Sequence, residues 1–572
     1  MKNLELARMF EDLAELLEFK GENPFKLRAY HNAGRAMQNL SEDIETVCRE
    51  GRLEEIPGVG EGIAKKIKEY LETGRMTKFE EAKQGLPAGF LQMMQIPGLG
   101  PKTISLVNKK LGIDTIEKLE AAVKDGKLRE LPGMGEKKEE NILRGIALLR
   151  SGAQRIPLGE AWPIVQEIVE KLKAATGLKK IVPAGSLRRM KETIGDIDIL
   201  VAAKDGKEVI QKFVKGPWVK EVLAAGETKG SVIAHGGRQA DLRVVVEGSF
   251  GAALQYFTGS KEHNIKLRDI AKKMGMKVNE YGLFKGERKV AGATEEEIYE
   301  KLGLDCMPPT LREDRGEIEA AAAHKLPKIV EMCDLKGDLH VHSDWSDGKS
   351  TIEEMARAAM ARGYEYVCIT DHTPSLKVFG GLTERELEEK LDEIAAVQKR
   401  VRGIRILSGA EVDIKPDGSL DYSDKTLAKM DVVTASVHSA FKQDEKTMTE
   451  RILKAIENPQ VDIIGHPTGR LIGKREAYAV DVEALLRRAA ETGTAMEVNS
   501  FYDRLDLNDT NCRRAMELGV LIAINTDSHH VNQLDQIRFG VATAQRGWIE
   551  AKEVLNAKPL KALIQHLEKR GK

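Results

Sequence analysis

Seven short apolar segments alternate with helical patterns from residue 335 to the end of the chain, and this rhythm limits the possible folds most strongly. The segments are KGDLHVHS, YEYVCITDH, GIRILSGAEVDI, DVVTASVHS, VDIIGHPTG, GTAMEVNS and VLIAINTDSHH. Helices between consecutive strands predict parallel neighbours, because a parallel pair needs a long crossover connection. The region is therefore expected to form a parallel open sheet or a barrel.

Six of these seven segments end in side chains that bind metals. The predicted ligands are His340, His342, Asp347, His372, Glu411, His438, His466, Asp527 and His529. In an α/β barrel the carboxyl ends of the strands meet at one mouth. A single histidine of this kind is more often structural, and we assign His530 and His566 to that class. Nine imidazole and carboxylate groups together can hold two or three ions of Zn, Mn or Fe.

Residues 155–247 have a different character, with β-branched runs that predict an α/β unit. The segment GSLRRMKETIGDIDIL begins there at Gly185. A tight turn at Gly185 and Ser186 can cradle a triphosphate, and Arg188 and Arg189 can neutralise its charge. The turn is therefore a predicted nucleotide-binding site.

Three aspartates complete this predicted site. Asp196 and Asp198 are two residues apart on a strand, so their side chains face the same side. Asp241 stands at the start of a later strand and is expected to join them. A lone pair of this kind is usually a solvated strand end, but here a Gly-Ser turn precedes the pair. Three carboxylates that share two Mg²⁺ ions support phosphoryl transfer.

The first 150 residues contain an internal repeat. IPGVGEGIAKKI, IPGLGPKTISLV and LPGMGEKKEENI follow one another at spacings of 35 to 40 residues. A glycine turn before a helix exposes backbone N–H groups that can bind a DNA phosphate without reading sequence. Ordinary helix packing with glycine caps is the alternative, but three copies favour DNA binding. The predicted contacts are Gly58, Gly60, Gly98, Gly100, Gly133 and Gly135.

The motifs of residues 1–317, GSLRR, GDIDI and YFTGS, resemble those of the family X DNA polymerases, the family of DNA polymerase beta. The resemblance implies that Asp196, Asp198 and Asp241 bind the metals, and that Ser186 and Arg189 contact the incoming triphosphate. The remaining nucleotide-site residues that it implies are Gly185, Tyr256, Phe257, Gly259, Asn264 and Arg268. Tyr256 and Phe257 would lie beside the sugar, and Asn264 and Arg268 near the minor groove.

The same resemblance implies a lyase in the first repeat. Lys66 stands where the family carries a lysine that forms a Schiff base and removes a 5′-deoxyribose phosphate. Lys26 and Tyr30 stand at supporting positions, but Gly62 replaces a further lysine. A lysine crowded by cations can become nucleophilic. A plain phosphate contact by Lys66 remains an equal alternative.

Residues 337–572 resemble the polymerase-and-histidinol-phosphatase (PHP) domain. This likeness implies a distorted (β/α)7 barrel with a trinuclear metal site that hydrolyses phosphoesters. In bacterial and archaeal family X polymerases such a domain is a Mn²⁺-dependent 3′–5′ exonuclease, and AP endonuclease and 3′-phosphatase activities are associated with it. All nine ligand positions are occupied in this sequence.

We therefore expect a multidomain α/β protein with a helical helix-hairpin-helix N-terminal region, a nucleotidyltransferase palm and thumb, and the PHP barrel. The expected boundaries are 1–80 for a lyase-like domain, 81–154 for a fingers-like domain, 155–247 for the palm, 248–317 for the thumb, 318–334 for a linker and 335–572 for the barrel. Its expected function is gap filling in base excision repair, with end processing in the barrel.

The expected cofactors are two Mg²⁺ ions in the polymerase site and two or three Mn²⁺ or Zn²⁺ ions in the barrel. The expected partners are gapped or nicked DNA and dNTPs. A net charge of −1 leaves DNA binding to local arrangements. The five scattered cysteines, and the lack of a signal peptide or a long apolar run, favour a cytoplasmic protein with no membrane partner, and we expect a monomer. A phosphoesterase with an inert polymerase half and a non-catalytic DNA scaffold are the two rival interpretations.

Overall fold

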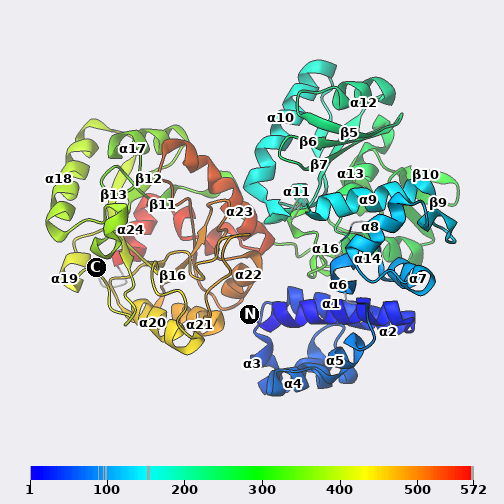
Figure 1. The fold of residues 1–572 in the computed structure, drawn as a ribbon. Helices are drawn as coiled ribbons and strands as arrows, with labels where there is room; N and C mark the ends of the chain where they lie inside the picture. Colours follow the sequence, from blue (N-terminus) through cyan, green and yellow to red (C-terminus); the bar gives the residue numbers. More distant parts are fainter. Residues whose placement is uncertain (1, 88, 95, 97–98, 151–154, 569–572) are drawn as a thin grey trace. The chain divides into compact units, whose positions relative to one another are not determined.

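The computed structural model describes residues 2–87, 89–94, 96, 99–150 and 155–568. The chain divides into two compact units, Met1–Gln154 and Arg155–Lys572 (Figure 1). In the described parts of the chain, no helix is long and apolar enough to cross a membrane. The two units are described separately.

The first unit is helical. Its helices are α1 (Lys2–Lys20), α2 (Pro24–Asn39), α3 (Ile44–Arg49), α4 (Glu61–Thr73), α5 (Thr77–Lys83), α6 (Phe90–Met94), α7 (Pro101–Leu111), α8 (Ile116–Lys124) and α9 (Glu136–Arg150), with short 3₁₀ turns at Leu53–Glu55 and Leu128–Glu130. The described residues of the repeat turns lie directly before α4, α7 and α9, as the sequence predicts. Gly60 and Gly100 are the N-terminal caps of α4 and α7, and Gly58 has a φ of +89° that favours glycine.

The second unit begins with a mixed five-stranded sheet of order β2-β4-β7-β6-β5. Its strands are β2 (Ile181–Pro183), β4 (Ile197–Ala202), β5 (Val219–Ala225), β6 (Lys229–Ala234) and β7 (Gln239–Val245), and β1 (Ile156–Pro157) pairs separately with β3 (Thr193–Ile194). The helices of this part are α10 (Leu158–Thr176), α11 (Gly185–Arg188) and α12 (Gly206–Val214). Strands β4 and β7 are parallel neighbours at the centre, which places their ends side by side.

A smaller mixed region follows. It contains α13 (Phe250–Thr258), α14 (Lys261–Lys273), β8 (Met276–Asn279), β9 (Gly282–Lys285), β10 (Arg288–Ala291), α15 (Glu295–Lys301) and α16 (Glu317–Ala322), with 3₁₀ turns at Glu247–Ser249 and Pro309–Leu311. The three strands form an antiparallel sheet of order β10-β9-β8. The segment after α16 packs against the last region. Val330 lies in the hydrophobic core of that region, and its N–H donates a hydrogen bond to the carbonyl of Ile549.

The last region is a parallel barrel in which seven strands lie in sequence order. The strands are β11 (Gly337–Val341), β12 (Tyr366–Ile369), β13 (Arg405–Asp413), β14 (Val432–Ser436), β15 (Ile463–Ile464), β16 (Ala495–Asn499) and β17 (Ile522–Asn525). A bridge between Val341 and Ser528 nearly closes the sheet onto itself. All seven predicted strands are present, and the choice between an open sheet and a barrel is decided in favour of a nearly closed barrel.

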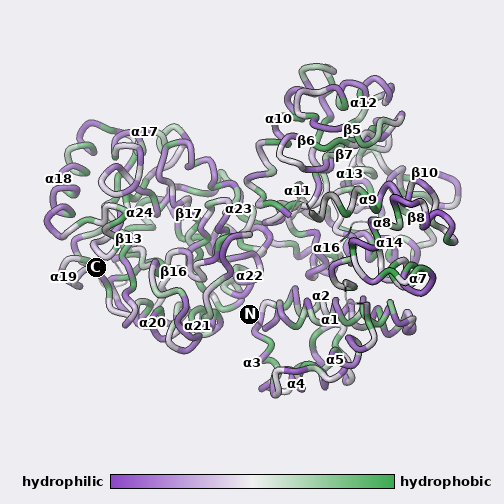
Figure 2. Tube along the Cα trace, in the orientation of Figure 1, coloured by the Kyte–Doolittle hydropathy of each residue, from purple (hydrophilic) through white to green (hydrophobic). Residues whose placement is uncertain are grey.

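Helices cover the outside of this barrel, and one helix closes its interior. The helices are α17 (Ile352–Ala361), α18 (Glu384–Arg400), α19 (Asp424–Leu427), α20 (Glu445–Glu457), α21 (Val482–Thr492), α22 (Asp509–Glu517), α23 (Ile537–Arg546) and α24 (Leu560–Glu568); 3₁₀ turns lie at Met332–Asp334, Pro374–Phe379, Val531–Gln536, Ala551–Glu553 and Leu555–Ala557. Alternating strand side chains point outward to the helices or inward, where Tyr366 and Cys368 meet Leu563 of α24. Apolar and polar positions mix along the helices (Figure 2).

Candidate active sites

The predicted polymerase carboxylates meet at the centre of the five-stranded sheet. Asp198 on β4 and Asp241 on β7 are register partners on neighbouring parallel strands, and Asp196 lies exposed just before β4. Burial, together with Asp196 and Asp241, raises the pKa of Asp198 to about 7. Lys229 lies 3.0 Å from Asp241 and offsets part of the negative charge. The cluster has the surplus of carboxylate charge that a divalent cation would relieve.

The Gly-Ser turn lies directly against this cluster. Gly185 has a φ of +59°, and a Cβ atom there would lie 2.4 Å from Oδ2 of Asp198. Only glycine therefore allows the backbone to approach the carboxylate so closely. Ser186 follows in the short helix α11.

The two predicted arginines of this turn have different partners. Arg188 makes a bidentate pair with Glu295, at 2.9 and 2.6 Å, and donates to Oγ1 of Thr258 at 2.7 Å. Arg189 donates from Nε to Glu313 at 2.9 Å and from Nη1 to the Thr258 carbonyl. Arg188 thus ties the five-stranded part to the region after it.

The other predicted nucleotide-site residues gather on α13 and α14. The rings of Tyr256 and Phe257 lie edge to face, with centroids 5.2 Å apart. Asn264 donates to the Tyr256 carbonyl at 2.7 Å, and Arg268 donates to the Asn264 carbonyl at 3.2 Å. Gly259 has a φ of +72° and faces Arg189, whose Nη1 would lie 3.1 Å from a Cβ atom. The structure therefore brings these residues into one connected group.

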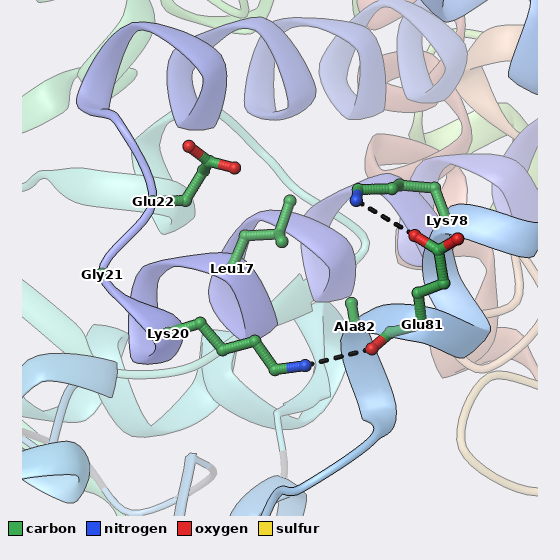
Figure 3. A pocket seen from close by; sticks show the side chains of 7 residues that line it. All are labelled: Leu17, Lys20, Gly21, Glu22, Lys78, Glu81 and Ala82. Carbon is green, nitrogen blue, oxygen red and sulfur yellow. Dashed lines mark hydrogen bonds and ion pairs between the residues drawn. The ribbon is translucent and has the colours of Figure 1, made fainter.

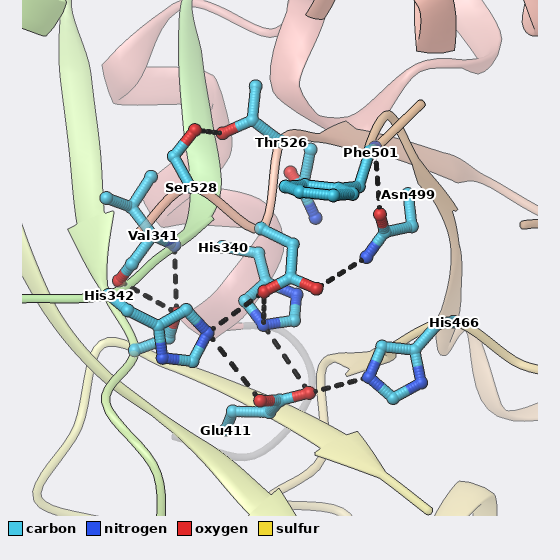
Figure 4. Close-up of polar contacts among 12 residues, drawn as sticks. His340, Val341, His342, Glu411, His466, Asn499, Phe501, Thr526 and Ser528 are labelled. Atoms are coloured by element: carbon cyan, nitrogen blue, oxygen red, sulfur yellow. Dashed lines mark hydrogen bonds and ion pairs between the residues drawn. The ribbon is translucent and has the colours of Figure 1, made fainter. Parts of the chain in front are cut away.

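The nine predicted ligands of the barrel converge at its mouth. Three overlapping groups could each hold a metal ion: His342, Asp347, His372 and His529; His340, His342 and Asp527; and His372, Glu411 and His438. His466 joins them through Nε2, which lies 2.9 Å from Oε1 of Glu411. Figure 4 shows His340, His342 and His466 pointing toward Glu411; His340 and His342 come from the end of β11, and His466 follows β15.

The polar atoms at this mouth fit metal ligation. Among the described residues, Nε2 of His340 and both ring nitrogens of His342 are fully buried and form no hydrogen bond of normal geometry, although carboxylate oxygens lie nearby, with Oδ1 of Asp527 3.1 Å from Nε2 of His342. Buried polar atoms almost always have partners, so such a cluster is unusual without an ion. Imidazole and carboxylate donors in overlapping groups suit two or three borderline cations.

A second layer of polar residues, which the sequence alone does not predict, holds these ligands. Glu497 lies 2.7 Å from Nδ1 of His340, and Asn499 donates to Asp527 at 3.0 Å. Asp413 lies 3.2 Å from Nδ1 of His438. The available signal was the segment AMEVN, the one predicted strand without a ligand, where Glu497 and Asn499 share a face of an apolar strand.

The first unit holds the predicted lyase residues. Nζ of Lys66 donates to the Gly62 carbonyl at 2.8 Å and lies 5.8 Å from the ring centroid of Tyr30. Burial and the neighbouring ammonium of Lys78 lower the pKa of Lys66. Lys26 pairs with Glu22 at 3.5 Å.

A cavity of about 420 Å³ lies in the same unit, and Lys78 is on its wall (Figure 3). The other lining residues are Leu17, Lys20, Gly21, Glu22, Glu81 and Ala82. Lys20 and Lys78 are the cations of this wall, and both contact Glu81. The predicted lysine nucleophile is therefore electrostatically coupled to Lys78 on the wall of this cavity.

The predicted DNA-backbone contacts lie in the repeat turns, except that Gly98 is outside the described residues. A Cβ atom at Gly60, Gly100, Gly133 or Gly135 would meet nothing within 4 Å. These four positions are therefore open to an approaching phosphate, whereas a Cβ atom at Gly58 would lie 3.4 Å from the Cβ of Asn32.

Protein-family models match five consecutive segments of the chain. A helix-hairpin-helix domain matches residues 1–76, and a SAM-like helix-hairpin-helix tandem matches 90–147. DNA polymerase beta palm and thumb models match 155–238 and 253–313, and a PHP domain matches 338–501.

The names of similar curated proteins agree with these family matches. The DNA polymerase/3′-5′ exonuclease PolX of Bacillus subtilis (strain 168) is 41% identical, over 100% of both chains. A probable phosphatase of Thermoanaerobacter sp. (strain X514) is 34% identical over 34% of this chain and 78% of its own length. A probable phosphatase of Acetivibrio thermocellus is 32% identical over 35% of this chain and 83% of its own.

Proposed function

Because the chain belongs to the PolX family of DNA polymerases that carry a PHP domain, we propose that it is a DNA-directed DNA polymerase and a 3′–5′ exonuclease. It would fill short gaps during base excision repair and trim DNA ends with the barrel. The observation that carries this proposal is the presence of two separate and complete sets of ligand side chains. One set surrounds Asp198 and the other surrounds Glu411.

In the polymerase site, Asp196, Asp198 and Asp241 would hold two Mg²⁺ ions, which supply charge stabilisation for phosphoryl transfer. Ser186 and Arg189 bind the triphosphate of the dNTP beside them. The edge-to-face rings of Tyr256 and Phe257 pack against the sugar and exclude a ribose. The connected pair Asn264 and Arg268 reaches the minor-groove side of the new base pair.

In the barrel, the nine converging ligands would hold two or three ions, Mn²⁺ or Zn²⁺, which supply a nucleophile for phosphoester hydrolysis. Glu497 and Asp413 fix the orientation of His340 and His438, and each selects the ring nitrogen left for the metal. The substrates are DNA 3′ ends, with AP-site cleavage and 3′-phosphate removal as further reactions of the same site.

The first experiment uses single-gap DNA with a labelled primer, dNTPs and Mg²⁺ or Mn²⁺. Asp198→Ala should abolish extension but still shorten the primer, and His342→Ala should do the reverse. Each variant is the control for the fold of the other. Degradation of DNA by His342→Ala at the wild-type rate would contradict the assignment of the exonuclease to the barrel.

A second activity, a 5′-deoxyribose-phosphate lyase, is favoured by the environment of Lys66. Its amine is half buried, its pKa is lowered by burial and by Lys78, and Tyr30 lies beside it. Schiff-base formation needs the neutral amine, and a lowered pKa increases the fraction of the lysine in that form. A phosphate contact alone would favour a fully charged lysine.

Borohydride trapping on DNA with an incised abasic site tests the lyase. Wild type should form a covalent adduct, and Lys66→Ala should not. Lys65→Ala is the matched control, because Lys65 is its exposed neighbour and pairs with Glu61 at 2.6 Å. If Lys66→Ala and the wild type form equal amounts of the covalent adduct, Lys66 is not the nucleophile and its role is that of a phosphate contact.

The partners that we propose are gapped or nicked DNA and dNTPs, with the repeat turns of the first unit on the DNA backbone. We also propose domain boundaries at 80, 154, 247, 317 and 334, a monomeric state and a cytoplasmic location. The proposal excludes the two rivals, an inert polymerase half and a scaffold without catalysis. A scaffold would bind gapped DNA equally well with and without metal and would leave the DNA unchanged.

A further inference from the structure

The barrel is docked onto the five-stranded part of the same unit through apolar contacts. Leu505 and Phe539 of the barrel belong to the same buried cluster as Leu158 of α10. The rings of Phe539 and Trp162 meet edge to face, with centroids 6.2 Å apart. At Gly159 a Cβ atom would lie only 2.2 Å from the Cβ of Tyr502. The two parts are therefore closely packed.

A buried ionic cluster lies on the same interface, and Arg546 of α23 is its centre. Arg546 is 5% exposed. Its Nε and Nη2 contact Oδ2 of Asp509 at 3.0 and 2.8 Å, within the barrel. Its Nη1 crosses the interface and donates to Glu313 and to the main-chain carbonyl of Arg189, each at 2.9 Å.

Arg189 of the polymerase site and Arg546 of the barrel are therefore linked through a shared carboxylate. The Glu313 oxygen that accepts from Arg546 also accepts from Nε of Arg189. Arg546 thus holds both the backbone of Arg189 and the carboxylate that orients its side chain. A long arginine side chain loses much rotamer freedom when it is fixed, so a prepared Arg189 binds its ligand at lower entropic cost.

The charges in this cluster also favour an anion. A carboxylate paired with Arg189 alone would cancel its positive charge. Arg546 shares the same carboxylate oxygen, and Lys191 lies 3.9 Å from the other Glu313 oxygen. Arg546 also pairs with Asp509, which a fourth cation, Arg315, contacts at 3.1 Å. Four cations around two carboxylates keep a positive balance toward a triphosphate.

We propose that Arg546, although it belongs to the barrel, is a positioning residue of the polymerase site, which prepares Arg189 to bind the triphosphate of the incoming dNTP. This inference rests on the proposed function of Arg189 as a triphosphate contact. It assigns the barrel a role in polymerisation that is independent of hydrolysis. The alternative is that Arg546 only fastens the two parts together.

Steady-state extension of single-gap DNA by the full chain distinguishes a positioning role of Arg546 from a role in docking alone. Arg546→Met should raise the KM for dNTP by about tenfold, which corresponds to one lost charge-assisted contact. It should leave kcat and the KM for DNA within about twofold, because Arg546 does not touch the reacting atoms. Arg546→Lys should recover part of the loss.

Glu192→Gln is the matched control for docking. Glu192 forms another ion pair across the same interface, with Arg470 at 2.8 Å, and lies three residues from Arg189. It does not contact Glu313. We expect the KM of Glu192→Gln for dNTP to equal that of the wild type. Glu313→Gln, which keeps the shape of the side chain, should raise the KM as Arg546→Met does, and thermal unfolding confirms that each variant is folded.

Three results would overturn the inference. One is an unchanged KM for dNTP in Arg546→Met when Arg189→Ala raises it, which leaves the proposed function intact. Another is an equal rise in Glu192→Gln, which would mean that docking alone matters. The third is an unchanged KM in Arg189→Ala itself, which refutes the triphosphate contact and the inference with it.

Discussion

Single residues behind the metal ligands decide how the barrel site is oriented. Glu497 has no exposed surface and lies against Nδ1 of His340, so it directs Nε2 of the same ring into the mouth. Such carboxylate–histidine pairs set the tautomer of a ligand and raise its basicity. The charge of Glu497 therefore matters although it does not face the substrate.

At this scale we predict that Glu497→Gln lowers the affinity of the barrel for Mn²⁺ or Zn²⁺ by about 10- to 100-fold, because the amide holds His340 less firmly. Metal titration with a chelating dye measures it. Extension of gapped DNA should be unchanged. Glu483→Gln is the control, since Glu483 is a barrel carboxylate that pairs with Arg514 instead of a ligand. Wild-type metal affinity in Glu497→Gln would contradict the prediction.

At the scale of elements, the Gly-Ser turn at the start of α11 links backbone conformation to chemistry. Its glycine has a positive φ, and its Cα faces the carboxylate of Asp198. The start of β4 and the start of α11 therefore approach each other only when position 185 has no side chain. The positions of the carboxylates depend on this turn as well as on the sheet.

Gly185→Ala should lower the rate of nucleotide addition by about 100-fold, because the new methyl group displaces Asp198. Primer extension measures the rate, and hydrolysis by the barrel should be unchanged. Gly177→Ala is the control, because Gly177 has a similar φ of +70° and nothing within 4 Å of its Cβ position. An equal loss of extension in Gly177→Ala would mean that backbone strain explains the loss and contact with Asp198 does not. Extension by Gly185→Ala at the wild-type rate would contradict the prediction.

At the scale of the whole molecule, the interface between the barrel and the polymerase part depends on buried charges. Burial alone would raise the pKa of Glu313, but Arg546, Arg189 and Lys191 hold it at about 2. Asp509 is likewise held below its usual range, against burial, by Arg315 and Arg546. The folded state therefore binds fewer protons than the unfolded state in moderately acidic solution.

We predict that acid weakens this interface. A depressed folded pKa means that the stabilisation by Glu313 is complete above its ordinary value of 4.5 and is lost as the pH falls toward about 2. Over this pH window the free energy of unfolding of the wild type should fall by on the order of 3 kcal/mol more than that of Glu313→Gln. Thermal unfolding from pH 6 to the acid limit, on the order of pH 2, measures the difference. Parallel curves for the two proteins would refute it.

The sequence by itself determined the element types, the seven barrel strands, the repeat turns and the likeness to two families. These depend on local patterns, such as side chains two residues apart on one strand face. The position of ligands at strand ends also follows, because the carboxyl ends of parallel strands meet. The residues of the polymerase site could also be predicted from the sequence, because they lie in short contiguous motifs that resemble those of the family.

Only the tertiary structure decided which partners hold those residues. Glu497 meets His340 from 157 residues away, and Arg546 meets Arg189 from 357 residues away. It also separated two adjacent arginines, with Arg188 on Glu295 and Arg189 on Glu313. Buried polar partners are selected by packing and desolvation, which depend on the three-dimensional surroundings and leave no periodic trace along the chain.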